Sequence, residues 1–250
     1  MMLFSKTSII QSMLLSGWIC LIGLSQSVMA DNTHITVLQK QVILSYQEEV
    51  RFSQILNDAN SQLQYEFYPL GSSLINPRKQ PIVEMQKQFV LKQLAELNTP
   101  AANHLAEKVN SLHLVYHEKM SLDFIKVRTK HKLNPIVKGE YWLSLQKRPT
   151  DVTIFDSAQN KFKNISLNKS FDLRDYLEEF SLASEQPPYD SVWIIQADRS
   201  IYQVKDLQWK NTLYFLSPGA MVFIGLPNLP DDYRDLNANV AHLFAFRLEL

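Results

Sequence analysis

The stretch YWLSLQKRPTDVTIF, residues 141–155, contains two apolar and aromatic runs on either side of an Arg-Pro-Thr turn at 148–150. Runs of this composition around a turn are typical of β-strands. A weaker alternating run further on predicts a third strand. The strands expected here are residues 141–145, 152–155 and 161–167. We expect them to belong to one folded unit that covers residues 141–226.

One helix and three more strands complete this unit. Ser170 is placed as an N-cap, and apolar residues then recur at offsets 0, 3, 4 and 7, which predicts about two turns of amphipathic helix. These apolar residues are Leu173, Tyr176, Leu177 and Phe180. After Pro187-Pro188, further apolar runs predict strands at 192–195, 201–204 and 221–224. A few strands, one helix and then more strands indicate the β-grasp (ubiquitin-like) arrangement of the α+β class.

A smaller sheet domain is expected at the start of the folded chain. Strand-like runs at 34–37 and 42–44 are followed by Ser45 and Glu48, which have the spacing of a capping box at the start of a helix. An aromatic run at 65–70 predicts one more strand. Strands that lead into one helix repeat the later unit in miniature, so we expect tandem β-grasp domains.

A helical hairpin is expected between the two sheet domains. Pro81 suits the first turn of a helix that Thr99-Pro100 ends, and a second helix is expected from about 101 to 119. The short connection predicts antiparallel packing. The apolar side of the first helix carries Ile82, Met85, Phe89, Leu94 and Leu97. The expected organisation is a signal peptide (1–30), a small β-grasp-like domain (31–77), the hairpin (78–122), a second β-grasp domain (123–228) and a C-terminal amphipathic helix (229–250).

The first 30 residues have the pattern of a cleavable signal peptide. Lys6 is their only charged residue, an apolar stretch follows it, and Val28-Met29-Ala30 suits a signal peptidase. We expect cleavage after Ala30; retention as an uncleaved anchor is the alternative. Cys20 is the only cysteine of the chain and leaves with this segment. The mature protein therefore has no disulfide, thiolate metal site or cysteine nucleophile.

Composition and motifs exclude several kinds of chemistry. The chain has 25 basic and 25 acidic residues, so it lacks the electrostatic footprint of a nucleic-acid-binding protein. No glycine belongs to a phosphate-binding motif, and neither a nucleophile elbow nor a pair of opposed carboxylates is recognisable. We assign no catalytic residue, no cofactor and no metal ligand. The expectation is a protein that is not an enzyme.

The pattern that most resembles a metal motif is His113-Leu-Val-Tyr-His117. Histidines four apart on a helix face the same way and could hold zinc. A zinc protease also needs a glutamate where Leu114 or Tyr116 stands. We therefore interpret both histidines as ordinary surface residues.

Aromatic and apolar residues offer candidates for contact with a glycan or partner. Trp142 and Trp193 stand inside predicted strands and should pack in the core, whereas Trp209 stands in a loop and is expected to expose its ring. The C-terminal helix has an apolar stripe, which either docks on the protein's own sheet or contacts a membrane or another protein. The candidate contact residues are Trp209, Tyr233, Leu236, Val240 and Phe244.

Several short motifs, in consistent order, resemble the capsule-biosynthesis GfcC-like proteins of Gram-negative bacteria. They are Asn134-Pro135, Gly139-Glu140-Tyr141, Lys147-Arg148-Pro149, Val152-Thr153-Ile154, Trp209-Lys210, Ser217-Pro218-Gly219-Ala220 and Tyr233-Arg234-Asp235-Leu236-Asn237. The resemblance implies a periplasmic protein with tandem β-grasp domains, an inserted helical hairpin and a terminal amphipathic helix. One departure is the turn Ala197-Asp198-Arg199, where relatives commonly have a glycine at the third position.

The resemblance implies an accessory protein of capsule or exopolysaccharide assembly and export. We expect it to bind the polysaccharide or an outer-membrane component of the export machinery. The alternative is a periplasmic enzyme that modifies the polymer, which the lack of a recognisable catalytic set disfavours.

Overall fold

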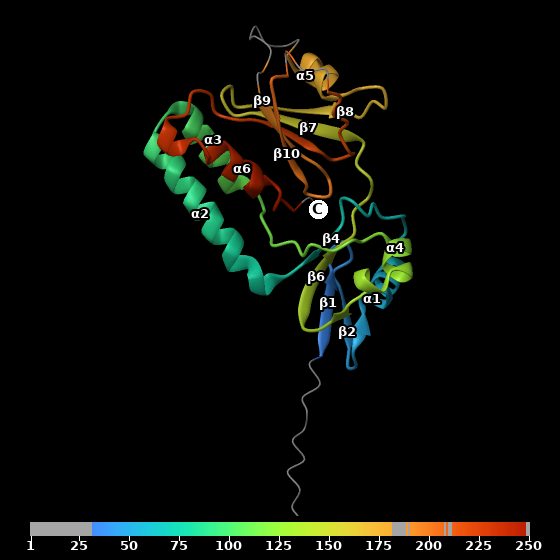
Figure 1. Ribbon diagram of the computed structural model, residues 1–250. Coiled ribbons are helices and arrows are strands. Elements are labelled where there is room, and N and C mark those ends of the chain that lie inside the picture. The colour runs from blue at the N-terminus through green and yellow to red at the C-terminus, as the bar shows by residue number, and fades with distance from the viewer. Residues whose placement is uncertain (1–31, 182–188, 190, 208, 210–211, 249–250) are drawn as a thin grey trace, which may run out of the picture. The chain divides into compact units, whose positions relative to one another are not determined.

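The computed structural model describes residues 32–181, 189, 191–207, 209 and 212–248. Within them the chain forms a mixed α+β structure, with two larger sheets and helices packed against them (Figure 1). The predicted signal segment and Lys210 of the Trp209-Lys210 motif lie outside the described residues. Among the described helices, none combines the length and apolarity that a membrane crossing needs.

The first sheet has four strands in the order β2-β1-β6-β4. Their bounds are Thr33–Val37 (β1), Val42–Tyr46 (β2), Ser73–Ile75 (β4) and Glu140–Ser144 (β6). The central strands β1 and β6 are parallel, and the outer pairs are antiparallel. Helix α1 (Phe52–Ser61) packs on one face against Ile35, Val37 and Leu143, because alternate residues of a strand point to the same side.

Smaller elements extend the α1 side of this sheet. A two-stranded ladder joins Val50–Arg51 (β3) to Ile136–Val137 (β5), and helix α4 (Phe124–Thr129) packs beside α1. Asp123 begins α4, since its carboxylate accepts a hydrogen bond from the backbone N–H of Lys126 (3.0 Å).

Several expectations for this region are wrong. Residues 140–144 form the centre of the first sheet and not part of the second unit, because β6 pairs with β1 across about a hundred residues of chain. Ser45 lies inside β2 and caps no helix; α1 begins at Phe52, without a side-chain cap. Residues 65–70 form no strand, and the strand that follows Gly71 is β4.

The second sheet has five strands in the order β10-β9-β11-β7-β8. Their bounds are Asp151–Asp156 (β7), Lys161–Ser166 (β8), Ser191–Ile195 (β9), Ile201–Lys205 (β10) and Met221–Ile224 (β11). Strand β11 runs parallel to β7 and antiparallel to β9. All five strands lie within a residue or two of the runs that predicted them.

Helix α5 (Leu173–Ser181) covers one face of the second sheet. Its buried residues are the four expected ones, Leu173, Tyr176, Leu177 and Phe180. The cap differs from the expectation: the Asp172 carboxylate accepts from the backbone N–H of Arg174 (2.8 Å), whereas the Ser170 hydroxyl bonds to Asn168.

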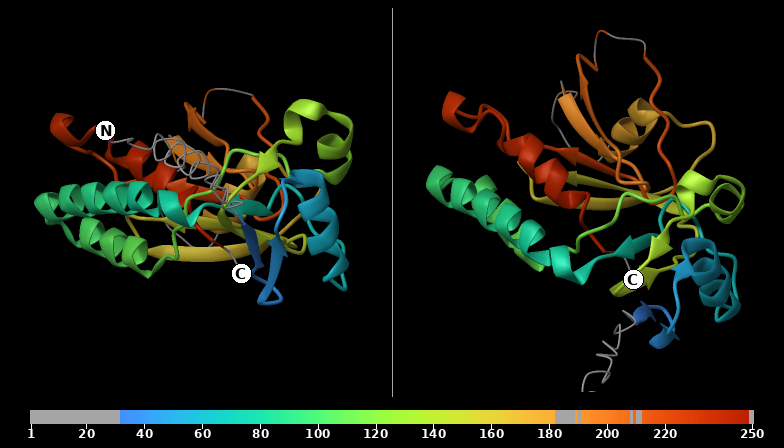
Figure 2. Two further views of the ribbon diagram at one scale, coloured as in Figure 1. Left: turned by 90° about the horizontal axis from the view of Figure 1, so that it is seen from below. Right: turned by 60° about the horizontal axis from the view of Figure 1, so that its bottom comes forward.

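Three helices cover the opposite face of this sheet and lie side by side (Figures 1 and 2). They are α2 (Gln80–Leu97), α3 (Pro100–Ser111) and α6 (Leu236–Phe244). α2 and α3 form the expected hairpin, with Asn98 in the left-handed conformation at the turn and Thr99 capping α3. Short 3-10 turns precede α2 at Pro77–Lys79 and α6 at Asp231–Tyr233, and a third lies at His131–Leu133.

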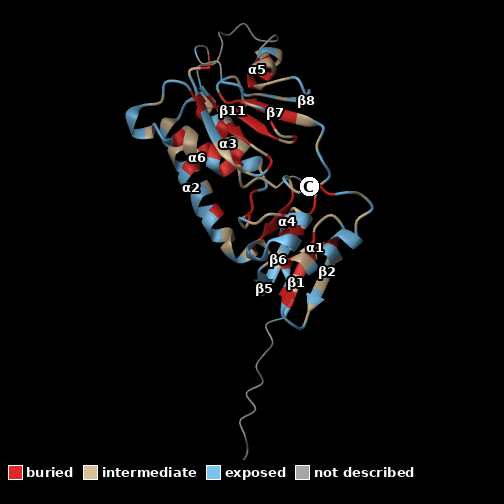
Figure 3. Cartoon of the chain, turned by 45° about the vertical axis from the view of Figure 1, so that its right-hand side comes forward, coloured by how far each residue is buried: buried red, intermediate tan, exposed pale blue. Residues whose placement is uncertain are grey.

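Apolar residues form the core between these helices and the sheet, and Figure 3 shows the buried positions in red. Phe244 of α6 packs edge-on against Phe155 and Phe223 of the sheet, with ring centroids 6.1 and 5.1 Å apart. α2 contributes Val83, Val90 and Leu94. The terminal helix is thus part of this core, as one of the two sequence interpretations had it.

The apolar side expected for α2 is only partly buried. Leu94 is fully buried, but Ile82, Met85 and Phe89 are 41%, 67% and 55% exposed. The buried line is rotated around the helix because α3 and α6 both pack against α2.

The second hairpin helix is shorter than expected. α3 ends at Ser111, and residues 113–118 are extended. Leu114 pairs with Arg247 near the C-terminus, and His117 pairs with Ile75 at the edge of β4. Backbone hydrogen bonds to the C-terminal segment and to β4 replace the helical bonds of this segment.

Candidate binding pocket

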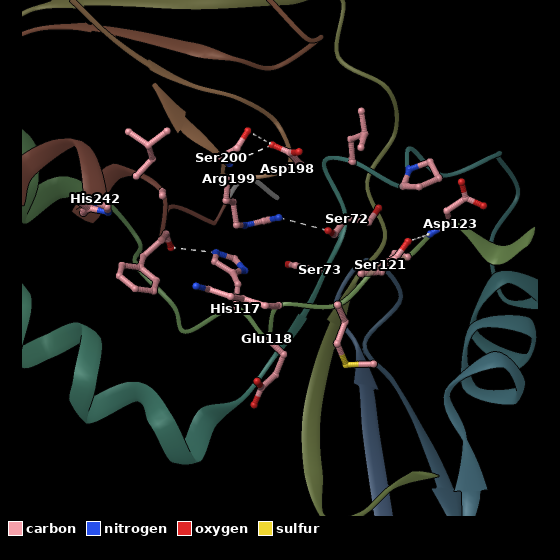
Figure 4. A pocket seen from close by; sticks show the side chains of 18 of the residues that line it. Ser72, Ser73, His117, Glu118, Ser121, Asp123, Asp198, Arg199, Ser200 and His242 are labelled. Atoms are coloured by element: carbon pink, nitrogen blue, oxygen red, sulfur yellow. Dashed lines mark hydrogen bonds between the residues drawn. The ribbon is translucent and has the colours of Figure 1, made fainter. Parts of the chain in front are cut away.

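A pocket of about 970 Å³ opens where segments distant in the chain meet (Figure 4). We call it the central pocket. Its walls are residues 69–73, residues 117–126, the β9–β10 turn with Ile201, and the end of α6 with the segment after it. Side chains that form hydrogen bonds alternate with apolar ones such as Leu122 and Phe246. Loops and strand ends form most of the lining, and Gln86 of α2, Lys126 of α4 and His242 of α6 add residues from helices, so the surrounding sheets and helices position the site.

His117 lies at the inner side of the pocket because its segment is tied down on two sides. The backbone N–H of Glu118 donates to the Leu74 oxygen (2.8 Å), and that of Val115 donates to the Phe246 oxygen (2.9 Å). The His117 side chain is 7% exposed, and its Nε2 lies 3.2 Å from the Phe246 carbonyl oxygen. The interpretation of His117 as a surface residue is therefore wrong.

Burial controls the charge of His117. Loss of solvent, together with the nearby positive charge of Arg199, lowers the pKa of the imidazole from 6.5 to about 3. His117 is thus neutral at neutral pH. It can hydrogen-bond a ligand, but it does not offer a positive charge.

Arg199 stands on the opposite wall, in the tight turn between β9 and β10. Its φ of 69° is left-handed, a conformation that glycine adopts more readily, which fits the expectation of glycine there in relatives. Nη1 donates to the Ser72 carbonyl oxygen (3.4 Å), so the guanidinium joins this turn to the residue before β4. Ser72 also binds the Tyr68 oxygen through its hydroxyl (2.8 Å).

The three carboxylates of the pocket are held by protein groups. Glu118 binds Lys79 (2.8 Å) and Asn76 (2.7 Å); although burial alone raises the pKa of Glu118, these bonds lower it. Asp123 caps α4 and pairs with Lys126 (3.1 Å), whereas Asp198 accepts from Ser200. Each carboxylate therefore has a structural partner.

The two histidines that were considered as a zinc pair do not lie on one face of a helix. His113 is exposed and His117 is buried, because the segment that carries them is not helical. Among the described residues, no three His, Cys, Asp or Glu side chains are placed to hold a metal ion.

The five candidate contact residues do not form one site. Trp209 is 82% exposed, as expected, and Tyr233 is half-buried with its hydroxyl 3.2 Å from the Glu96 carboxylate. Leu236, Val240 and Phe244 are fully buried in the protein's own core, so a partner cannot reach them in this structure. None of the five lines the central pocket.

Two tryptophans expected in the core differ from one another. Trp142 is 37% exposed, because Tyr141 and Leu143 on either side of it face the α1 core and direct it to the other side of the sheet. Trp193 is half-buried and packs against the core under the helices.

These features define an α+β protein with a large pocket of mixed polar and apolar lining and a buried terminal helix. Comparison with known proteins gives the family: residues 30–148 match the capsule biosynthesis GfcC N-terminal model, and residues 161–249 match the GfcC C-terminal model. The chain belongs to the GfcC family, and this involves it in capsule biosynthesis.

One similar protein is from Escherichia coli (strain K12), where it is described as uncharacterized protein YjbG. The two are 26% identical over 148 residues, which is 56% of this chain and 60% of that protein. The match thus spans less than two thirds of the relative.

Proposed function

We propose that this protein is a non-enzymatic accessory protein of capsule or exopolysaccharide assembly, and that it binds a segment of the polysaccharide in the central pocket. The observation that carries the proposal is the pocket itself. Its volume of about 970 Å³ is at the upper end of the usual range for small-molecule sites, enough for more than one sugar residue. Its lining offers hydroxyl, amide and charged groups to the edges of a sugar and apolar surface to its faces.

The state of the ionisable groups supports binding over catalysis. Glycoside hydrolysis needs one carboxyl group with a raised pKa opposite a free carboxylate. The pocket carboxylates are paired or capping, and the pKa values of Glu118 and Asp123 are lowered. Because the pKa of His117 is lowered to about 3, its imidazole is too weak a base to serve as a general base near neutral pH.

We also infer that both sheets are β-grasp domains. In each unit the first and the last long strand form a parallel central pair, β1 with β6 and β7 with β11. The neighbouring strands take equivalent places, so that the order β2-β1-β6-β4 matches the order β8-β7-β11-β9. In each unit a helix follows the first two long strands: α1 comes after β2 and the two-residue strand β3, and α5 comes after β8. The hairpin then stands inside the first unit, between β4 and β6.

Export to the periplasm through a signal peptide cleaved after Ala30 is part of the proposal. The signal-like sequence of residues 1–30 and the absence of cysteine after it support this placement. Contact with outer-membrane export components would use the surface of the protein, since the terminal helix is buried in its core.

The test is an array of bacterial exopolysaccharide fragments, probed with the purified protein. We expect saturable binding of at least one fragment, with nuclear magnetic resonance shifts at residues 72–73, 117–123 and 198–201 and no shortening of the fragment. Binding with shifts confined to another surface would contradict the pocket assignment. Release of smaller products would contradict the non-enzymatic role.

A further inference from the structure

Two buried polar atoms at the inner side of the central pocket have no hydrogen-bond partner within the part of the chain that is described. They are Nδ1 of His117 and Oγ of Ser73. Ser73 is 2% exposed and His117 is 7% exposed, and both line the pocket. Figure 4 shows them close to Arg199, with Asp123 and His242 on opposite sides of the group. A buried polar atom without a partner is costly, so a ligand that satisfies it gains affinity.

The tautomer of His117 follows from its neighbour. The Phe246 carbonyl oxygen, 3.2 Å from Nε2, can only accept a hydrogen bond. Nε2 must therefore carry the proton. In the neutral ring Nδ1 is then a lone pair that accepts, and burial opposes a second proton on the ring.

This arrangement selects the chemistry of a ligand. The group opposite Nδ1 must donate a hydrogen bond, and the Ser73 hydroxyl can donate or accept. A sugar hydroxyl meets both requirements. A carboxylate or phosphate oxygen would place a lone pair against the lone pair of Nδ1.

The charged groups that line the pocket are of both signs. The cations are Lys119, Lys126 and Arg199, and the carboxylates are Glu118, Asp123 and Asp198, of which Glu118 is already paired with Lys79 outside the pocket lining. Lys126 is paired with Asp123, and the Arg199 guanidinium binds the Ser72 oxygen. The pocket therefore lacks the cluster of available arginines that typically recognises acidic groups.

We propose that His117 and Ser73 form a subsite that binds hydroxyl groups of an uncharged sugar residue. This inference rests on the proposed binding of polysaccharide and adds the class of sugar. The subsite excludes a sugar residue whose acidic group would have to lie against His117 and Ser73. Acidic residues elsewhere on the polymer remain in the open part of the pocket.

The first test compares matched glycans on wild type and variants. An array is built from neutral oligosaccharides and the same oligosaccharides oxidised at C6 to uronates. We expect wild type to prefer the neutral member of a bound pair, and Ser73→Ala to bind it about five- to tenfold more weakly, the effect of one hydrogen bond. Ser200→Ala is the matched control, since it removes a pocket hydroxyl already bonded to Asp198 (2.5 Å), and we expect less than a twofold change.

The thermal stability of the Ser73→Ala variant distinguishes a role of Ser73 in ligand binding from a role in holding the fold. Ser73→Ala should melt no lower than wild type, because its hydroxyl has no protein partner to lose. Lower stability together with unchanged affinity would overturn the inference.

The second test reads the His117 ring by nitrogen-15 correlation spectroscopy. We expect the Nε2–H tautomer without ligand, and a shift of the Nδ1 resonance when a neutral oligosaccharide binds. An Nδ1–H tautomer, or a preference for the uronate, would overturn the inference while leaving polysaccharide binding in place. Failure of every glycan to bind would overturn both, and a bound glycan that leaves Nδ1 unshifted would overturn the subsite alone.

Discussion

The side-chain amide of Asn237 makes two hydrogen bonds with the backbone of Leu226, accepting from its N–H and donating to its carbonyl oxygen, each at 2.9 Å. These two hydrogen bonds attach the start of α6 to the segment that follows β11, in the way that a neighbouring strand would pair with it. Gly225 makes the close approach possible, since a Cβ at that position would overlap the Asn237 amide. The motif Tyr233-Arg234-Asp235-Leu236-Asn237 thus contains the residue that attaches the terminal helix.

We expect Gly225→Ala and Asn237→Ala each to lower the free energy of unfolding by about 2 kcal/mol, through overpacking in the first case and lost hydrogen bonds in the second. In the double variant the methyl group added at position 225 occupies the space left by the Asn237 amide. The two losses should therefore be non-additive by at least about 1 kcal/mol. Denaturant unfolding of the four proteins measures this coupling, and additive losses would show that the contact is not tight.

Removal of the Phe244 ring should be among the most damaging single changes. The ring is fully buried between α6 and the second sheet, against Phe155 and Phe223, so Phe244→Ala should cost about 4 kcal/mol. Trp209→Ala is the control, because this larger ring is 82% exposed, and we expect a change within about 0.5 kcal/mol. Thermal and denaturant unfolding check both values. A small effect at Phe244 would indicate that α6 leaves the core and becomes available to a partner.

Local pattern predicts much of this fold. The strands and helix of the second sheet follow from alternation and from the spacing of Leu173, Tyr176, Leu177 and Phe180, all of which are buried. These signals lie within a few residues of one another. Two local signals compete at Ser45. The capping-box spacing predicted the start of a helix, but the strand alternation of Val42–Tyr46 is stronger, so Ser45 belongs to a strand.

Non-local pairing explains what the pattern could not give. β6 reads as a strand, but whether it joins the first or second sheet depends on its parallel pairing with β1. The end of α3 at Ser111 depends on hydrogen bonds from residues 113–118 to β4 and to the C-terminal segment. Helical spacing in those residues is therefore no guide to their conformation.

The central pocket was not predictable for the same reason. Its walls come from several distant parts of the chain, and none of these parts carries a local pattern that marks a binding site. The spacing of His117 from His113 raised the possibility of a zinc pair, and without the glutamate of a zinc protease both residues were interpreted as ordinary surface histidines. The departure from glycine at Arg199 marks a residue that lines the pocket, although by itself it predicts only an unusual turn.

Helix α2 offers a direct comparison of a buried and an exposed apolar residue. Leu94 is fully buried against α3 and α6, whereas Met85 is 67% exposed. Leu94→Ala should lower the free energy of unfolding by about 3 kcal/mol, and Met85→Ala should change it by less than about 0.5 kcal/mol. Equal losses in denaturant unfolding would mean that Met85 is covered in solution, for example by a second molecule. Dependence of that loss on protein concentration would identify this case.

His117 should make the stability of the protein depend on pH between about 6.5 and 3. In the unfolded chain an ordinary histidine takes up a proton as the pH falls below 6.5. In the folded protein, burial and the charge of Arg199 hold the pKa of His117 at about 3, although backbone hydrogen bonds to Phe246 and Arg247 raise it. The unfolded state therefore binds more protons in this range, and stability falls as the pH falls. The loss is complete only below the folded pKa. Between pH 7 and pH 5 the loss from this group alone should be about 2 kcal/mol.

His117→Gln removes the titrating group while keeping an amide that can donate to the Phe246 oxygen. Whatever its stability at pH 7, its free energy of unfolding should fall by about 2 kcal/mol less than that of wild type between pH 7 and pH 5. The control His113→Gln changes an exposed residue of the same segment and should leave the wild-type slope unaltered. Equal slopes for His117→Gln and wild type would show that water reaches the imidazole. The pocket would then be more open around His117 than its 7% exposure indicates, and a lone pair hydrated in this way would not select for sugar hydroxyls.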